Sequence, residues 1–238
     1  MSARFQELDW RQTPLGELTL RRRRDPRSGE DVHEIKLNDE FLMSSLFTVA
    51  EVELARLALA DMPREPLQVV VGGLGLGYTA HTVLEHEHVA ELVVVDALNE
   101  VIEWHQQGLI PAGRQLAADP RCRLVHGDFF AMLRSGDGFD PAQPGRKFDA
   151  IIVDIDHSPR HLLHPSNADL YQPEGLRRLA GLLRPGGTFA LWSNDPPDDE
   201  FTADLANVFP TTRAEIVSFP NPLQDRDSTN TVYLATRS

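Results

Sequence analysis

Acidic side chains stand at the ends of three apolar segments that the pattern predicts to be strands. Asp96 ends ELVVVD, Asp128 follows RCRLVHG, and Asp154 follows KFDAIIV, with Asp156 two places further on. Ligands of open α/β sheets lie beyond the carboxyl ends of the parallel strands, so we expect these carboxylates to meet in one crevice. Alternate residues of an extended segment face the same way, which predicts that Asp154 and Asp156 both point into it. A carboxylate there can hold an ammonium group and accept its proton, so both are candidate catalytic residues.

Three alternating glycines, Gly73, Gly75 and Gly77, begin at the end of an earlier predicted strand, LQVVVGG, in the segment VVVGGLGLGYTA. A ligand can approach such a turn closely because no Cβ blocks it, and a helix N-terminus lies beyond it. The dinucleotide fingerprint G-x-G-x-x-G fits poorly, because Tyr78 stands in place of its third glycine. The turn therefore favours a nucleoside ligand without pyrophosphate, such as S-adenosylmethionine or its decarboxylated form. The alternative is a tight turn that needs positive φ for structural reasons only.

Two of the acidic residues have a specific expected role in holding such a nucleoside. Asp96 follows the glycines at about the spacing at which a carboxylate reaches both ribose hydroxyls. Gly127 and Asp128 stand where the adenine amino group can donate to a carboxylate. For both aspartates the alternative is a helix N-cap, since a helical segment follows each of them.

The elements that must position these residues alternate between strand and helix. Strands are predicted at 67–73, 91–96, 121–128, 147–154, 188–193, 211–219 and 229–237, and helices at 79–86, 99–108, 129–134, 173–183 and 199–209. This order predicts a doubly wound, Rossmann-like α/β sheet of seven strands. The last two strands have no helix between them and are expected to pair as an antiparallel hairpin.

The chain before Pro63 has a different pattern. Short strands are predicted at 16–24, 31–38 and 41–45, followed by a helix at 48–62. We therefore expect two parts, a β-rich flap with a linking helix over residues 1–62 and a nucleoside-binding and catalytic domain over residues 63–238.

Composition narrows the class of function. The chain has 238 residues and a formal net charge of −13, which argues against a general nucleic-acid binder. No segment is long and apolar enough to cross a membrane, so a cytoplasmic protein is expected. The single cysteine, Cys122, excludes an internal disulfide and a cysteine-based zinc site. His157, His161 and His164 cluster after Asp156, but prolines interrupt the segment, and we expect these histidines to shape an acceptor pocket without a metal.

From about residue 39 to residue 235, the chain resembles the spermidine/spermine synthase family of aminopropyltransferases, which use the class I methyltransferase fold. The matching segments are LNDEFLMSS, VVVGGLGLG, ELVVVDALNEVIEW, DPRCRLVHGDFFAML, KFDAIIVDIDHSP and LLRPGGTFALWS. The resemblance implies a small N-terminal β-domain, a homodimer, and transfer of an aminopropyl group from an S-adenosyl sulfonium donor to an amine or polyamine. By the same resemblance, Asp96 binds ribose, Asp128 binds adenine and Asp154 is catalytic.

The chain departs from the family pattern at three places, one of them after Asp96, where Ala97 and Leu98 stand in place of a further acidic residue. The family's glycine turn carries an aspartate that binds the amine of the aminopropyl group, and here Gly75 or Leu76 stands in its place. The family's D-S-S-D-P is D-I-D-H-S-P here, from Asp154 to Pro159. Two alternatives therefore stay open, a small-molecule methyltransferase that uses S-adenosylmethionine and a nucleoside-binding module without catalysis.

Overall fold

The computed structural model of the protein describes residues 5–38, 40–63, 65–221 and 223–238. Asp39, part of the segment LNDEFLMSS, lies outside these residues. The strands are β1 Phe5–Thr13, β2 Gly16–Arg24, β3 Asp31–Leu37, β4 Glu40–Ser44, β5 Leu67–Gly72, β6 Val89–Asp96, β7 Cys122–His126, β8 Phe148–Val153, β9 Leu183–Ser193, β10 Thr211–Asn221 and β11 Arg226–Thr236. The helices are α1 Val49–Leu59, α2 Tyr78–Glu85, α3 Asn99–Gln107, α4 Gly113–Ala118, α5 Phe129–Ser135, the 3₁₀ helix η1 Pro165–Tyr171, α6 Pro173–Leu182 and α7 Asp199–Ala206.

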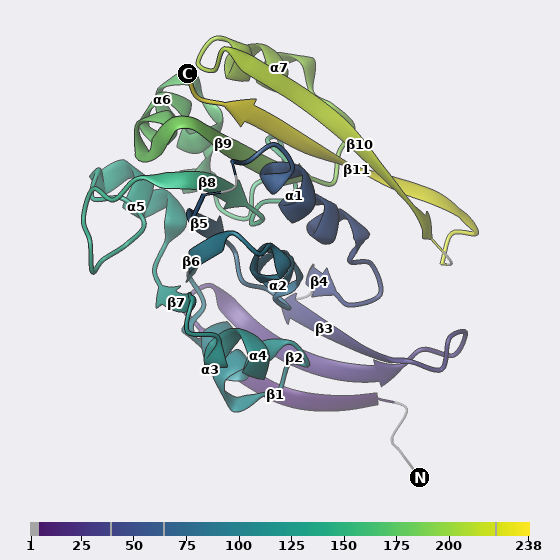
Figure 1. Cartoon of the computed structure of the whole chain (residues 1–238). Helices are drawn as coiled ribbons and strands as arrows, with labels where there is room; N and C mark the ends of the chain where they lie inside the picture. The colour runs from purple at the N-terminus through teal and green to yellow at the C-terminus, as the bar shows by residue number, and fades with distance from the viewer. Residues whose placement is uncertain (1–4, 39, 64, 222) are drawn as a thin grey trace.

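The larger sheet has seven strands in the order β10-β11-β9-β8-β5-β6-β7 (Figure 1). The pairs β5–β6, β5–β8, β6–β7 and β8–β9 are parallel, whereas β10 and β11 form an antiparallel hairpin. The central strands are apolar on both faces, which is typical of strands covered by helices on both sides. The predicted α/β architecture and the C-terminal hairpin are confirmed. The carboxyl ends of β5 to β8 lie along one edge, as the argument about the acidic residues requires.

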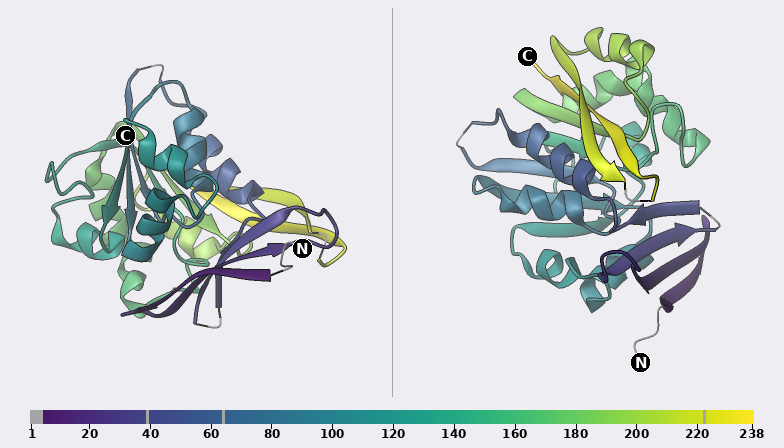
Figure 2. Two further views of the ribbon diagram at one scale, coloured as in Figure 1. Left: turned by 90° about the horizontal axis from the view of Figure 1, so that it is seen from below. Right: turned by 90° about the vertical axis from the view of Figure 1, so that its right-hand side faces the viewer.

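Helices cover both faces of this sheet (Figures 1 and 2). One core combines the sheet with α1, α2 and α3 through residues such as Leu54, Val83 and Trp104, which are almost completely buried. The other combines it with α5, α6 and α7 through residues such as Phe129 and Leu176. The two cores hold the strand ends in place from both sides.

The N-terminal sheet is an antiparallel meander, β1-β2-β3-β4. Its first strand was not expected from the sequence. The pairing of β1 with β2 shifts register between Glu7 and Asp9, and such a bulge breaks the alternation by which a strand is recognised. The arginine run of β2 is tied to β3, because the Nε atoms of Arg21 and Arg23 donate to the two carboxylate oxygens of Glu34, at 2.6 and 2.8 Å.

Two contacts fasten the N-terminal sheet onto the larger one. The indole Nε1 of Trp104 donates to Asp9 over 2.7 Å, and the sulfur of Met43 accepts from the backbone N–H of Leu76 over 3.1 Å. Helix α1 packs against α2 and against β8 to β11, so it belongs to the layers of the larger sheet. The division of the chain at about residue 62 stays a prediction, and the packing of α1 favours a boundary between β4 and α1.

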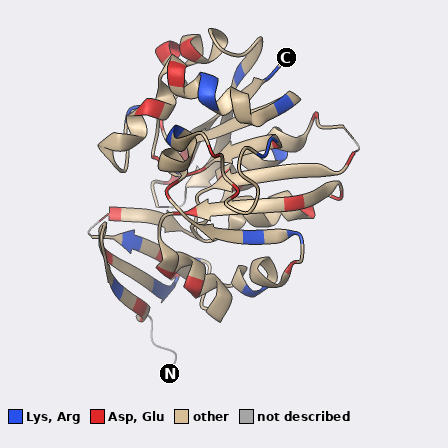
Figure 3. Ribbon diagram, turned by 90° about the vertical axis from the view of Figure 1, so that its left-hand side faces the viewer, with Lys and Arg blue, Asp and Glu red and all other residues tan. Residues whose placement is uncertain are grey.

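In the described residues, no helix has the length and the apolar composition that crossing a membrane requires. Figure 3 shows acidic and basic residues interspersed over both parts of the molecule.

The first prediction concerns the turn after β5. Gly73 has φ +93°, and a Cβ there would lie 2.1 Å from the backbone oxygen of Asp154. Gly73→Ala should therefore lower the free energy of unfolding by at least about 2 kcal/mol, from positive φ plus overlap with backbone. Gly181→Ala is the matched control, because nothing lies near a Cβ there and a helical alanine should stabilise by about 0.5–1 kcal/mol. Urea unfolding measures both, and equal stability of the Gly73 variant and the wild type would contradict the close approach.

Candidate functional site

A cavity of about 370 Å³ lies at the carboxyl ends of β5 to β8. Its walls include Gly73 and Gly75 of the glycine turn, the three predicted aspartates, and apolar side chains of the N-terminal sheet such as Ile35 and Leu42. The structure thus brings Asp96, Asp128 and Asp154 together, as the strand topology predicts. The N-terminal sheet completes the enclosure.

The glycine turn makes close contacts on both of its sides. Gly73, Gly75 and Gly77 all have positive φ, of +93°, +47° and +88°. A Cβ on Gly75 would lie 2.9 Å from the sulfur of Met43, and a Cβ on Gly77 would lie 2.6 Å from a methyl of Leu116. Gly73 and Gly75 line the cavity, whereas Gly77 lies behind the turn at the N-cap of α2. Two of the three predicted glycines are thus placed to contact a ligand directly, and the third supports the turn.

Asp96 lines the cavity and also holds its wall. One carboxylate oxygen accepts from the backbone N–H of Leu74 and the other from that of Leu98, each at 2.8 Å. Burial raises the pKa of Asp96, and these backbone hydrogen bonds oppose the shift. Each oxygen can accept more than one hydrogen bond, so the carboxylate keeps capacity for ribose hydroxyls while it fixes the turn.

Asp128 caps a helix and lines the cavity, while its contact with adenine stays a prediction. It is the N-cap of α5, where its side chain accepts from the N–H of Ala131 at 3.0 Å, and it lines the cavity from an exposed position. Gly127 is not in the cavity wall; its N–H donates to the backbone oxygen of Asp96 at 2.9 Å. It therefore positions the strand end that carries Asp128.

Asp154 follows the last residue of β8 and faces the cavity. The hydroxyl of Thr79 donates to its carboxylate over 2.7 Å, and its backbone N–H donates to the oxygen of Gly72 over 2.9 Å. Burial raises its pKa to about 6. A carboxylate in this condition is mostly ionised at neutral pH and close to the point where it exchanges protons.

Glu51, from α1, is a site residue that the sequence analysis missed. It lines the same cavity as Asp154. Burial, followed by the negative charge of Asp154, raises its pKa to about 8. Helical periodicity placed it on a linking helix and gave no sign that it reaches the strand ends. Glu51 stands three places after Thr48, a spacing typical of a capping box, but Thr48 makes no side-chain cap hydrogen bond.

Asp156 does not reach the cavity, contrary to the expectation from alternation. Strand β8 ends at Val153, so the period of two stops before this residue. Asp156 is 1 % exposed and accepts hydrogen bonds from the N–H of Leu163, the amide of Asn167 and the hydroxyl of Tyr171, at 2.7 to 2.9 Å. Asp156 therefore holds the segment after β8 in place and is not a candidate catalytic residue.

The three histidines of this segment differ in their contacts. His157 and His164 both line the cavity, His164 also accepts from the N–H of Ser166 as the N-cap of η1, and His161 contacts Asp195 at 2.9 Å. Within the described ranges, no group of three acidic, histidine or cysteine side chains is arranged to hold a metal ion.

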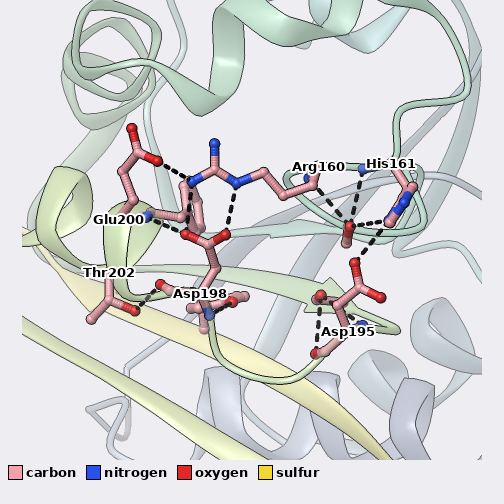
Figure 4. A network of polar contacts seen from close by, with 10 residues as sticks. Arg160, His161, Asp195, Asp198, Glu200 and Thr202 are labelled. Atoms are coloured by element: carbon pink, nitrogen blue, oxygen red, sulfur yellow. Dashed lines mark hydrogen bonds and ion pairs between the residues drawn. The ribbon is translucent and has the colours of Figure 1, made fainter.

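A polar network pins the same segment to the start of α7 (Figure 4). Arg160 forms a bidentate ion pair with Asp198, at 2.7 and 2.9 Å, and also donates a hydrogen bond to Glu200. Beside it, Ser158, His161 and Asp195 resemble a hydrolytic triad in composition only. The same nitrogen of His161, Nδ1, faces both partners, and Ser158 is buried. The network therefore has a structural role, since it joins the segment after β8 to the start of α7.

A second cavity of about 870 Å³ lies between the N-terminal sheet and the β10–β11 hairpin. It shares a boundary with the first cavity, made by Leu42, Met43, Glu51, His157 and Trp192. The indole Nε1 of Trp192 is buried and has no hydrogen-bond partner in the described part of the chain. A buried donor without a partner at such a boundary is suited to a ligand group.

The second prediction tests the structural role of Asp156. Asp156→Asn leaves three buried donors around a side chain with a single acceptor oxygen and should lower the free energy of unfolding by about 1–3 kcal/mol. Asp137→Asn, at an exposed position, should change stability little. Denaturant unfolding compares the two, and a stable Asp156 variant would contradict the proposed anchor.

The third prediction uses the pKa of Glu51. The folded protein keeps a proton on Glu51 up to about pH 8, whereas the ordinary value is 4.5. The stability from this proton is full below about pH 4.5 and is lost as the pH rises through about 8. Glu51→Gln should therefore lose less thermal stability than the wild type between pH 5 and pH 9. Glu53→Gln, at a partly exposed glutamate paired with Arg56, should behave as the wild type. Identical pH dependence in all three proteins would show that Glu51 is not buried beside Asp154.

Comparisons with known proteins agree with this geometry. The family model described as the spermine/spermidine synthase domain matches residues 49–205. A polyamine aminopropyltransferase from Pyrobaculum islandicum is 29 % identical over 163 residues, covering 66 % of this chain and 52 % of that protein. Polyamine aminopropyltransferase 2 from Pseudomonas aeruginosa is 31 % identical over 188 residues, covering 74 % of this chain and 48 % of that protein. The chain thus spans about half the length of these curated relatives.

Solved structures show the same fold. A crystal structure of spermidine synthase in complex with the transition-state analogue AdoDATO matches with a TM-score of 0.73 at 19 % identity, over 98 % of this chain and 74 % of that one. Spermidine synthase from Thermotoga maritima matches with a TM-score of 0.71, also at 19 % identity, over 98 % of this chain and 72 % of that one. The matched segment begins at the start of α1, ends within α7, and so contains Glu51 and the three cavity aspartates. The resemblance read from the motifs is confirmed: the chain belongs to the spermine/spermidine synthase family.

Proposed function

We propose that this protein transfers an aminopropyl group from decarboxylated S-adenosylmethionine to an amine acceptor. The observation that carries the proposal is the charge of the first cavity. Glu51, Asp96, Asp128 and Asp154 line it, and no lysine or arginine is among the described residues of its wall. Such a wall favours a ligand with positive charge and no carboxylate.

The donor alternatives differ in this property. S-adenosylmethionine carries a carboxylate, for which the cavity offers no basic partner among its described residues. Its decarboxylated form ends in an ammonium group and adds a second positive charge to that of the sulfonium. The charge of the wall therefore supports the aminopropyl donor over the methyl donor, although the turn carries Gly75 in place of the family's aspartate.

The proposal puts the nucleoside at the strand ends, where the sequence analysis expects it. In this proposal Gly73 and Gly75 allow the ligand to approach the backbone, Asp96 accepts from the ribose hydroxyls, and Asp128 accepts from the adenine amino group. Phe129, Phe130 and Leu98 supply apolar surface in the same wall. These contacts hold the part of the donor that does not react.

The reaction requires alignment more than covalent help. The lone pair of the acceptor nitrogen forms a bond to the carbon next to sulfur, the C–S bond breaks, and its electron pair stays on sulfur. The products are a neutral thioether, methylthioadenosine, and the alkylated amine, while one proton leaves the nitrogen. Asp154 is the proposed catalytic carboxylate, because its charge attracts the ammonium to the sulfonium and holds the two reacting groups together.

The acceptor enters through the second cavity in this proposal. That cavity meets the first at Met43, Glu51 and Trp192, so a nucleophile arriving there reaches the reacting carbon without displacing the nucleoside. The identity of the amine, the homodimer implied by the family and the cytoplasmic location stay predictions.

The fourth prediction tests donor and catalyst together. With putrescine as acceptor, the wild type should release methylthioadenosine from decarboxylated S-adenosylmethionine and transfer no methyl group from S-adenosylmethionine. Asp154→Asn should lower turnover by about 10²–10³-fold while the affinity for methylthioadenosine, measured by calorimetry, changes little. Methyl transfer without aminopropyl transfer would replace the proposal with the methyltransferase alternative. A fully active Asp154 variant would remove this residue from the catalytic role.

A further inference from the structure

Two carboxylates, Glu51 and Asp154, face the place where donor and acceptor must meet, and their surroundings differ. Asp154 lines the first cavity only, and its carboxylate already accepts the hydroxyl of Thr79 at 2.7 Å. Glu51 lines both cavities, and the hydrogen bond that lowers its pKa comes from its own backbone N–H and not from a side chain. The acidic group that an incoming amine meets first is therefore Glu51.

We propose that Glu51 is the proton acceptor for the amine nucleophile, while Asp154 stays ionised beside it. This inference rests on the proposed function, because it assigns the proton that the transfer releases. The ammonium of the acceptor gives its proton to the carboxylate of Glu51, and the freed lone pair attacks the carbon next to the sulfonium. The proton then leaves to solvent through the second cavity.

The charges in the site favour keeping the proton of the amine on the carboxylate pair as the reaction proceeds. Before reaction, a sulfonium and an ammonium face two carboxylates. After reaction, the sulfur is neutral and one positive charge remains on the alkylated amine. Once Glu51 has taken the proton, loss of the sulfonium charge raises the proton affinity of the carboxylate pair, so the proton stays on Glu51 as the new bond forms. Glu51 takes the proton because it borders the second cavity, whereas Asp154 lines the first cavity only and already accepts the hydroxyl of Thr79.

The other charged and titratable groups around Glu51 leave this role open to it. Tyr78, the first residue of α2, is close enough that the charge of Glu51 contributes to its raised pKa, after burial. His157 borders both cavities. Further out, the second cavity is lined by Arg21, Arg23, Glu34, Arg226 and Asp227. Glu34 is already paired with Arg21 and Arg23, so its carboxylate is not available as the base.

Turnover with two acceptors separates a proton acceptor from a structural residue. The acceptors are putrescine and its 2,2-difluoro analogue, whose amine next to the fluorines is largely uncharged at neutral pH. Glu51→Gln should lower kcat for putrescine by about 10²-fold or more and lower it much less for the analogue. The rise of kcat with pH should also disappear for this variant. Glu53→Gln, on the same helix but outside both cavities, should match the wild type. An equal loss with both acceptors in Glu51→Gln would overturn the proposal.

A binding measurement keeps the test independent of turnover. Putrescine is titrated into the protein saturated with methylthioadenosine, in two buffers of different ionisation enthalpy at pH 7.5. Binding of an ammonium should displace the proton of Glu51, so the wild type should release protons and Glu51→Gln should not. If the wild type turns over neither acceptor but shows this release, the proposed function fails and Glu51 remains a proton-exchanging ammonium site. Absence of release from the wild type, or the same release from Glu51→Gln, overturns the assignment of Glu51.

Discussion

The carboxylate of Asp96 holds together the part of the molecule on which the site depends. It sits at the end of β6 and accepts one backbone N–H from the glycine turn after β5 and another from the start of α3. Without these acceptors, two buried N–H groups would lose their partners. The same carboxylate lines the cavity, so the group that fixes the turn is also exposed to a molecule bound there. This double use explains why the turn can be rich in glycine and still keep one conformation.

A second constraint follows from burying several like charges around one cavity. Burial raises the pKa of Glu51 to about 8 and that of Asp154 to about 6, and the charge of Asp154 adds to the shift of Glu51. Such a site is less stable when empty than when it holds a cation. The buried carboxylates therefore favour the binding of a cation, and the proposed donor, a sulfonium with an ammonium tail, is such a cation. Loss of stability at high pH and affinity for cations are two results of the same arrangement.

The N-terminal sheet changes the family's site as well as closing it. Met43 of β4 puts its sulfur against Leu76 and occupies the space next to Gly75. A side chain at position 75, where the family places an amine-binding aspartate, would collide with this sulfur. The resemblance puts that aspartate at Gly75 or Leu76, and Met43 of β4 lies against both residues of the turn. The carboxylate on α1, Glu51, remains on the acceptor side of the same region.

The sequence by itself determined the alternation of strands and helices, the glycine turn, and the three acidic strand ends. These features depend on local periodicity and on the fact that parallel strands end at one edge, and both can be read without coordinates. Other features depended on the tertiary structure. The bulge in β1 breaks the alternation by which this strand could have been predicted. Because β8 ends at Val153, Asp156 points into the interior and accepts hydrogen bonds there. Glu51 and Met43 reach the site only because α1 and the N-terminal sheet pack over the strand ends. Contacts between segments so far apart in the chain leave no periodic signal, so only the folded structure could decide them.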